Sequence, residues 1–486
     1  MTTHVTILVG LAIYAVLMMG ISFYWMTRVK KAEDYLLAGR GLTYFVLVGT
    51  TVGSCIGTGV VIGASGLAYK HGWAGCAYPI GLGVGTMLIG LIFGRMRRFK
   101  FMTLGEEIAC YYSGHRGVIG ISNVSLFISQ LCWLTVQIMG GAAMLAALSG
   151  MPAPVAVVVS GIITAIVSVP GGLKTVVYTD CVQASIFLLG FSYLAYVALS
   201  DAGGFAGLKA AVPPERFSFL GVESYGSWQV VSLILTLILG VIADPGRRVT
   251  MYSAETEAGA KWGMVTGGAI VCAFAVIVGI VGMYTFKLNP NLPAPDQAIP
   301  WLVSSVLPPW LAAIVVVSVA SAIFSAANGN AAAVGTFFVR HIFPLVTGGR
   351  YPTQPLVVVR RALACAFVAS TTFAFYTRSI VGFVVQFLPT TMSGLAVIIL
   401  LGRFWKRANW QGALSALIVT PIAALTVRSF ADPAGIWTNP IIPATAAGIL
   451  AHVIVSSLTT PDRLSFEQTS DAMAVERRQI EDEPAV

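Results

Sequence analysis

The sequence is poor in charged residues. Only 10% of its 486 residues are Asp, Glu, Lys or Arg, whereas soluble proteins carry about 25%. Hydrophobic residues make up 57% of the chain, and the mean hydropathy is +0.83. This composition indicates a polytopic membrane protein with little mass outside the bilayer. The net charge of +9 therefore concerns membrane orientation, and we do not expect nucleic-acid binding.

Several motifs for other functions are also missing. The seven cysteines are scattered and form neither a Cys-x-x-Cys pair nor a cluster with histidine, which argues against a metal centre or a disulfide framework. No GxxxxGK[ST] loop occurs, so ATP-driven pumping is not expected. No HExxH or similar spacing marks an intramembrane hydrolase. We expect neither an enzyme nor a bound cofactor.

About thirteen apolar stretches are long enough to cross roughly 30 Å of hydrocarbon. The first lacks a basic leading segment and is too long for a signal peptide, so it is interpreted as a span. The predicted spans are 5–27, 42–69, 73–95, 117–149, 152–169, 175–199, 226–244, 262–286, 305–339, 356–376, 379–402, 408–427 and 436–457.

The basic residues predict an orientation in the cytoplasmic membrane. With the N-terminus outside and the C-terminus in the cytoplasm, roughly 23 of the 29 Lys and Arg lie on the cytoplasmic side, as the positive-inside rule expects. The segment 1–460 is then the transporter domain, and the charge-mixed tail 461–486 is expected to be cytoplasmic and disordered. The cytoplasmic clusters are Arg95/Arg97/Arg98/Lys100, Arg247/Arg248, Arg360/Arg361 and Arg403/Lys406/Arg407, and the residues outside are Lys70, Lys209, Arg216, Lys287, Arg378 and Arg428.

Two spans carry signs of interruption. The second contains six glycines between residues 49 and 66, and the seventh ends in LGVIADPG, with Asp244 and Pro245 at its end. Each opens a block of five spans, at 42–199 and 226–402. Interrupted helices at matching positions in two halves are typical of a transporter's midplane site, where unwound carbonyls can bind a cation. Close packing of small residues remains the alternative.

Two acidic residues within the spans are candidates for function. Asp180 lies six residues beyond Lys174. An intramembrane carboxylate indicates a functional site, although an interfacial Asp could instead face water or pair with Lys174. Asp244 could either cap the broken helix or face a solute.

Polar side chains on two further spans could line a solute cavity. Gln130, Trp133 and Gln137 share one helical face, because they are spaced by three and four residues. They could bind a polar solute or form hydrogen bonds between helices. Gln386 precedes Pro389 in the eleventh span and is interpreted as a cavity-lining residue.

Four motifs point to a known family. The stretches DYLLAGRGL, GASGLAYKHG, PGGLKTVVYTDCVQ and SAIFSAANGN resemble the sodium:solute symporter family, over about residues 5–457. Members of that family carry proline, pantothenate, sialic acid and sugars. The resemblance implies an all-α, LeuT-like fold of two inverted five-helix repeats, with one extra helix before them and two after.

The resemblance also implies a sodium site between the second and ninth spans. Asp180 matches the family's membrane aspartate, which would supply charge or a proton site. Ala326 stands where the family has a second hydroxyl, so we expect a weakened sodium site. The ligands carried over are the carbonyls of Gly53, Ile56 and Ala322 and the hydroxyl of Ser325.

These patterns predict a secondary active transporter that imports a small polar organic solute, with the solute, a coupling ion and the lipid bilayer as its partners. Sodium is the expected ion, and coupling to protons through Asp180 or transport without coupling stay open. A solute sensor acting with a separate signalling partner is the alternative of another class. Asp244 would favour a cationic solute only if it is not a helix cap.

Overall fold

The computed structural model describes residues 3–28, 32–168, 172–377, 379–430, 438–460 and 464–481. Arg378 and parts of the tail and of the last predicted span therefore lie outside the described residues. The helices are α1 Thr3–Met26, α2 Ala32–Leu37, α3 Tyr44–Cys55, α4 Ser65–His71, α5 Ala77–Phe93, α6 Leu104–Tyr111, α7 Arg116–Ser149, α8 Ala153–Ser168, α9 Gly172–Ala202, α10 Gly204–Ala211, α11 Val222–Tyr225, α12 Ser227–Ile242, α13 Pro245–Tyr252, α14 Glu257–Leu288, α15 Ala298–Ser305, α16 Pro309–Phe337, α17 Phe343–Thr347, α18 Pro355–Phe375, α19 Ile380–Thr391, α20 Ser393–Phe404, α21 Trp410–Ser429, α22 Ile441–Leu458 and α23 Phe466–Glu481.

The described part of the chain is a bundle of apolar helices. Nine segments are long and apolar enough to cross a membrane, and the count rises to eleven if the bent pairs α12–α13 and α19–α20 are each one span. The count of thirteen stays a prediction, since the remaining crossings would have to come from the short α8 and from α3 with the long segment Gly59–Phe99. The all-α membrane fold is confirmed.

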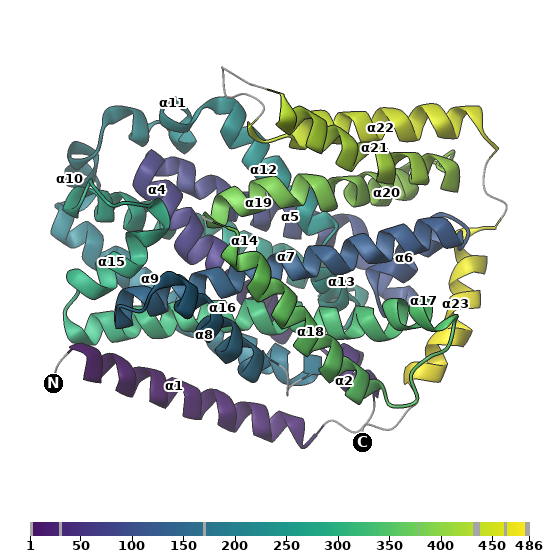
Figure 1. Cartoon of the computed structure of the whole chain (residues 1–486), viewed down its shortest axis with the longest axis horizontal. Coiled ribbons are helices and arrows are strands. Elements are labelled where there is room, and N and C mark those ends of the chain that lie inside the picture. Colours follow the sequence, from purple (N-terminus) through teal and green to yellow (C-terminus); the bar gives the residue numbers. More distant parts are fainter. Residues whose placement is uncertain are drawn as a thin grey trace.

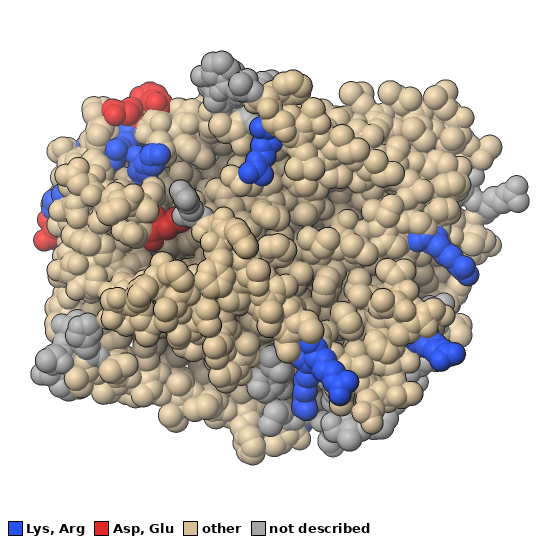
Figure 2. Space-filling model, in the orientation of Figure 1, with Lys and Arg blue, Asp and Glu red and all other residues tan. Residues whose placement is uncertain are grey.

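Apolar side chains cover the outside of the bundle as well as its core. On α1, which lies along one edge in Figure 1, Leu8, Ile13 and Phe23 are each about two-thirds exposed. Most of the face in Figure 2 is uncharged. An apolar exterior of this kind suits a hydrocarbon solvent, in which helices satisfy their own backbone polar groups.

The second predicted span is broken in the structure. Helix α3 ends at Cys55, and the chain leaves helical geometry at Ile56 (φ −90°, ψ 84°) before a π-helix at Gly59–Ala64 leads into α4. The seventh span is broken as well, because α12 and α13 meet at 49° around Asp244. A third bend, of 48°, separates α19 from α20.

The segment that precedes α3 and the segment that follows α13 meet each other. An isolated bridge joins Leu42, before α3, to Ala254, after α13, and the N–H of Leu42 donates to the carbonyl of Ser253 over 3.0 Å. In Figure 1, α6, α17 and α23 lie at one end of the bundle, and α10 and α15 lie at the opposite end. The two broken helices are thus tied to each other where they leave the bundle.

The tail is not disordered over Phe466–Glu481, which corrects the expectation from composition. There α23 packs on the end of the bundle: Arg477 forms an ion pair with Glu106 at 3.1 Å and donates to the Phe99 carbonyl over 2.9 Å. Burial raises the pKa of Glu106, but Arg340 and Arg477 outweigh it and hold that pKa below its usual value. Mixed charge predicts disorder only when the charges lack buried partners.

At the opposite end, the loop between α14 and α16 covers the start of α19. The Asp296 carboxylate accepts a hydrogen bond from the backbone N–H of Ile380 over 2.8 Å. Burial raises the pKa of Asp296 to about 6, and the Ile380 N–H opposes that rise. This contact ties the loop to a helix that bends beside the bundle centre.

Candidate functional site

Asp180 lies in the centre of the bundle, on α9. It is fully buried, and hydroxyls from two other helices satisfy its two carboxylate oxygens. Ser325 on α16 donates to Oδ1 over 2.6 Å, and Thr50 on α3 donates to Oδ2 over 2.7 Å. Lys174 pairs with Asp34 at 2.7 Å, so the alternative of an interfacial Asp180–Lys174 pair is wrong.

Helix α3 closely approaches both α9 and α16 at Gly53. A Cβ at this position would lie 2.7 Å from the Ser325 hydroxyl oxygen, closer than real Cβ contacts, and 3.1 Å from the Asp180 Cβ, tighter than most. Only glycine therefore lets the helix that breaks at Ile56 pack against the carboxylate. Three of the sequence-predicted ion-site residues, Gly53, Asp180 and Ser325, are brought together.

The chemistry of this cluster suits a hard cation. Its polar groups are a carboxylate, hydroxyls and backbone oxygens, the ligand types that hard cations prefer. Ile56 and Ala322 are both fully buried, at the break of α3 and on α16. Ala326 faces the same break, because a Cβ on Gly57 would lie 2.7 Å from its methyl carbon. An alanine here leaves one position on the break without a hydroxyl.

The polar face of α7 lies against both breaks. The Gln137 side-chain oxygen accepts from the N–H of Thr58, a donor freed by the break of α3, over 3.0 Å. Gln130 donates to Asp244 Oδ1 over 3.0 Å. Trp133, between them, lines a small cavity together with Gln137 and Asp244. These contacts bring the three α7 residues and Asp244 together around the bundle centre.

Asp244 caps the second broken helix. Its Oδ1 accepts from the N–H of Gly246 over 2.8 Å, at the start of α13, and Pro245 occupies the first helical position. Its Oδ2 lies 3.5 Å from Nε of Arg247. Of the two roles that the sequence allows for Asp244, the structure shows the cap, with its charge facing an arginine.

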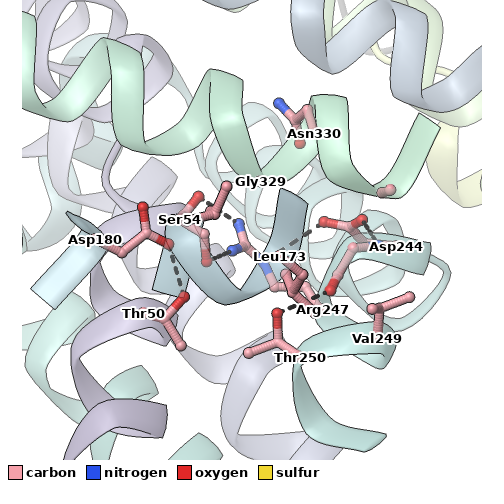
Figure 3. Close-up of a pocket in the computed structure, with 13 residues that line it drawn as sticks. Thr50, Ser54, Leu173, Asp180, Asp244, Arg247, Val249, Thr250, Gly329 and Asn330 are labelled. Carbon is pink, nitrogen blue, oxygen red and sulfur yellow. Dashed lines mark hydrogen bonds and ion pairs between the residues drawn. The ribbon is translucent and has the colours of Figure 1, made fainter. Parts of the chain in front are cut away.

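Arg247 is the central residue that the sequence analysis missed. Both arginines of the Arg247/Arg248 cluster are buried: Arg247 is 9% exposed and Arg248 is fully buried. Arg247 donates to the hydroxyl and to the backbone carbonyl of Ser54, the latter over 2.9 Å, one residue before the end of α3 (Figure 3). Arg248 pairs with the buried Glu107 at 3.2 Å. The position of Arg247, three residues after Asp244 at the Asp-Pro break, was the sequence signal that could have indicated a central role.

Gln386 does not belong to the site. Its side chain is exposed and accepts a hydrogen bond from Arg428 over 3.1 Å. Gln386 lines a separate, open cavity together with Phe373 and Ser379, so it has a cavity-lining position that is not the one around Asp180.

A family model matches most of the chain. The model of the sodium:solute symporter family covers residues 35–420. The chain belongs to the sodium:solute symporter family. The resemblance inferred from the four motifs is thereby confirmed.

Relatives within this family match over nearly their full length. The chain is 24% identical to the sodium/pantothenate symporter of Escherichia coli, over 92% of this chain and 95% of that protein. It is 24% identical to the sodium/glucose cotransporter of Vibrio parahaemolyticus, over 86% and 84%, and 23% identical to the human high affinity choline transporter 1, over 91% and 79%.

Solved structures show the fold. A Na+-coupled sialic acid symporter in a substrate-bound, outward-open state superimposes with a TM-score of 0.81 at 17% identity, over 95% of this chain and 99% of that one. The nucleobase-cation-symport-1 family transporter Mhp1, in a closed conformation, gives 0.60 at 16% identity, over 90% and 98%. The LeuT-like fold of this symporter family member is confirmed.

Membership of the sodium:solute symporter family gives the broad function. The protein is a multi-pass membrane transporter and not an enzyme, and it couples a small-molecule solute to sodium. Sodium is here a transported ion and not a resident cofactor. The solute and the individual ligand roles belong to the proposal below.

Proposed function

We propose that the protein imports a small polar organic solute across the cytoplasmic membrane together with sodium. The N-terminus lies outside and the C-terminus inside, and the inverted repeats are 42–199 and 226–402. The cation site lies between the broken α3 and α16, with the solute beside it against α7 and α13. The cation ligands in this proposal are the carbonyls of Gly53, Ile56 and Ala322 and the Ser325 hydroxyl, with Asp180 adjacent.

One observation carries this proposal. The fully buried Asp180 receives hydroxyls from both α3 and α16, so it sits where a broken helix meets the helix that carries SAIFSAANGN. A cation bound there would hold α3 against α9 and α16. Because a bound cation offsets the negative charge of the carboxylate, sodium arrival would favour one arrangement of these helices over another.

The site is proposed to be weak for sodium. Ala326 faces the break of α3 without a hydroxyl, and losing one polar contact costs about 1 kcal/mol. Arg247 adds a fixed positive charge at the Ser54 carbonyl. Both features lower the affinity for a cation without removing the carboxylate.

Uptake into proteoliposomes tests the proposal. The purified protein is given pantothenate, glucose, choline and short organic acids, under an inward sodium gradient, an inward proton gradient or neither. The proposal expects accumulation of at least one solute with sodium alone. Accumulation driven equally well without sodium would refute sodium coupling, and specific binding without any accumulation would favour the sensor.

A further inference from the structure

Arg247 separates two small cavities in the bundle centre. One is lined by Thr50, Asp180 and Thr250 and the other by Tyr78 and Trp133, and Arg247 borders both. Each has a volume of about 20 Å³, which is room for roughly one water molecule. In Figure 3 the guanidinium points between Ser54 and Asp244. A solute can therefore enter only as the surrounding helices separate, as a carrier requires.

The second cavity is bordered by hydrogen-bond donors without partners. The Tyr78 hydroxyl and the Trp133 Nε1–H have no hydrogen-bond partner among the described residues. The Arg247 Nε–H makes no hydrogen bond either, and its ion pair with Asp244 Oδ2 is 3.5 Å long. All three residues are more than nine-tenths buried. Indole and guanidinium groups only donate, and a phenol donates readily. A ligand that satisfies this cavity must therefore present acceptors.

Arg247 is also incompletely paired as a charge. The other buried arginines lie 2.6 to 3.2 Å from a carboxylate oxygen, whereas Asp244 is 3.5 Å from Arg247. The Oδ1 of Asp244 is already taken by Gln130 and by the N–H of Gly246. The remaining contacts of the guanidinium are neutral oxygens of Ser54. Guanidinium prefers two hydrogen bonds to one carboxylate.

We infer that the transported solute carries a carboxylate, which binds Arg247 with help from Tyr78 and Trp133. This inference rests on the proposed carrier function and names the solute class for the same site. It reverses the suggestion that Asp244 attracts a cationic solute, because the cap and Arg247 already engage that carboxylate. The acceptor oxygens of the solute satisfy the free donors of Tyr78 and Trp133, and its charge completes the pairing of Arg247.

Binding of matched compounds tests this inference without knowledge of the natural solute. Acetate, propionate, lactate, pyruvate and 3-hydroxybutyrate are each paired with their primary amides, which have the same shape and no charge. Thermal shifts of the wild-type protein in nanodiscs with sodium are then recorded. At least one acid should stabilise the protein tenfold more potently than its amide. Stabilisation by amides alone, equal potency within each pair, or no response to any acid would overturn the inference.

Two variants locate the effect at Arg247. Arg247→Gln should weaken acid binding at least tenfold, and Trp133→Phe, which keeps the ring and removes one donor, should weaken it about threefold. Arg407→Gln, an exposed arginine, is the matched control and should leave binding unchanged. If Arg247→Gln fails to fold, Trp133→Phe still decides the case, because unchanged acid binding in that variant contradicts the inference.

Uptake separates this inference from the carrier proposal. Sodium-driven accumulation of a neutral or cationic solute, with no acid transported, refutes the carboxylate and leaves the carrier intact. An acid that binds through Arg247 but never accumulates refutes the carrier and leaves the binding site intact.

Discussion

Ser325 on α16 donates its hydroxyl hydrogen to Asp180 on α9 over 2.6 Å. Thr50 makes the matching contact from α3, so one carboxylate joins three helices that come from distant parts of the chain. Since α3 breaks six residues after Thr50, movement of α3 must disturb this contact. The break in α3 and the Asp180 carboxylate are therefore linked.

Restoring a hydroxyl at the break should strengthen sodium coupling. Ala326→Ser adds one oxygen beside Gly57, and a polar contact of about 1 kcal/mol corresponds to roughly fivefold in affinity. We expect the sodium concentration for half-maximal uptake to fall by about that factor. Ala320→Ser, six residues earlier on the same helix, is the control. An unchanged sodium dependence would count against the proposed ligand set.

A methyl group at Gly53 should separate α3 from the carboxylate. Gly53→Ala places a Cβ 2.7 Å from the Ser325 hydroxyl oxygen, and overpacking of this kind costs about 1–3 kcal/mol. We expect a lower melting temperature and loss of sodium-dependent uptake. Gly20→Ala, where a Cβ meets nothing within 4 Å, should be harmless. Normal uptake by Gly53→Ala would show that the close approach is not needed for transport.

The docking of α23 should stabilise the protein. Arg477→Ala leaves the buried Glu106 with Arg340 as its remaining ion-pair partner, and loss of one buried partner costs about 3 kcal/mol. We therefore expect a drop of several degrees in the melting temperature. Glu467→Ala, an exposed position on the same helix, is the control. Equal melting temperatures for wild type and Arg477→Ala would mean that α23 does not pack on the helix bundle when the protein is in a membrane.

The contact at the opposite end should depend on pH. The folded pKa of Asp296 is raised to about 6 from an ordinary value of 3.8, so the folded protein holds a proton there that the unfolded chain has lost. Stability from this group is full below about pH 4 and falls as the pH rises to about 6. Asp296→Asn removes this loss of stability at higher pH, because an amide does not ionise, and its side-chain oxygen can still accept from the Ile380 N–H.

The melting temperatures of wild type and Asp296→Asn measure this effect between pH 4 and 8. The stability of the variant relative to the wild type should increase from pH 4 to 6 and stay constant above pH 6. The increase should be about 1 kcal/mol, because solvent screens the partly exposed carboxylate and reduces the effect. A constant difference across the whole range would show that the Asp296 carboxyl is not perturbed by folding.

The sequence predicted the features that depend on backbone chemistry. Glycines around residue 53 and the Asp-Pro pair at 244 interrupt helices for local reasons, so both breaks were predicted from residue types alone. The face of Gln130 and Gln137 follows from helical periodicity. These signals are local, and tertiary packing did not override them.

The missed features depend on partners that are distant in the sequence. A buried arginine such as Arg247 has the same composition signal as a surface one, and only the fold shows that Ser54 and Asp244 surround it. The same holds for α23, whose mixed charges look disordered until Glu106 is seen opposite Arg477. Gln386 lines a cavity as predicted, but its side chain is exposed and that cavity is separate from the Asp180 cluster.

Sodium binding to purified protein tests the central claim most directly. Saturable binding of radioactive sodium is measured for wild type, for Asp180→Asn and for Asp201→Asn, a partly exposed carboxylate paired with Lys287. The account predicts that Asp180→Asn weakens sodium binding at least tenfold while Asp201→Asn matches the wild type. Undiminished sodium binding by a folded Asp180→Asn protein would contradict it.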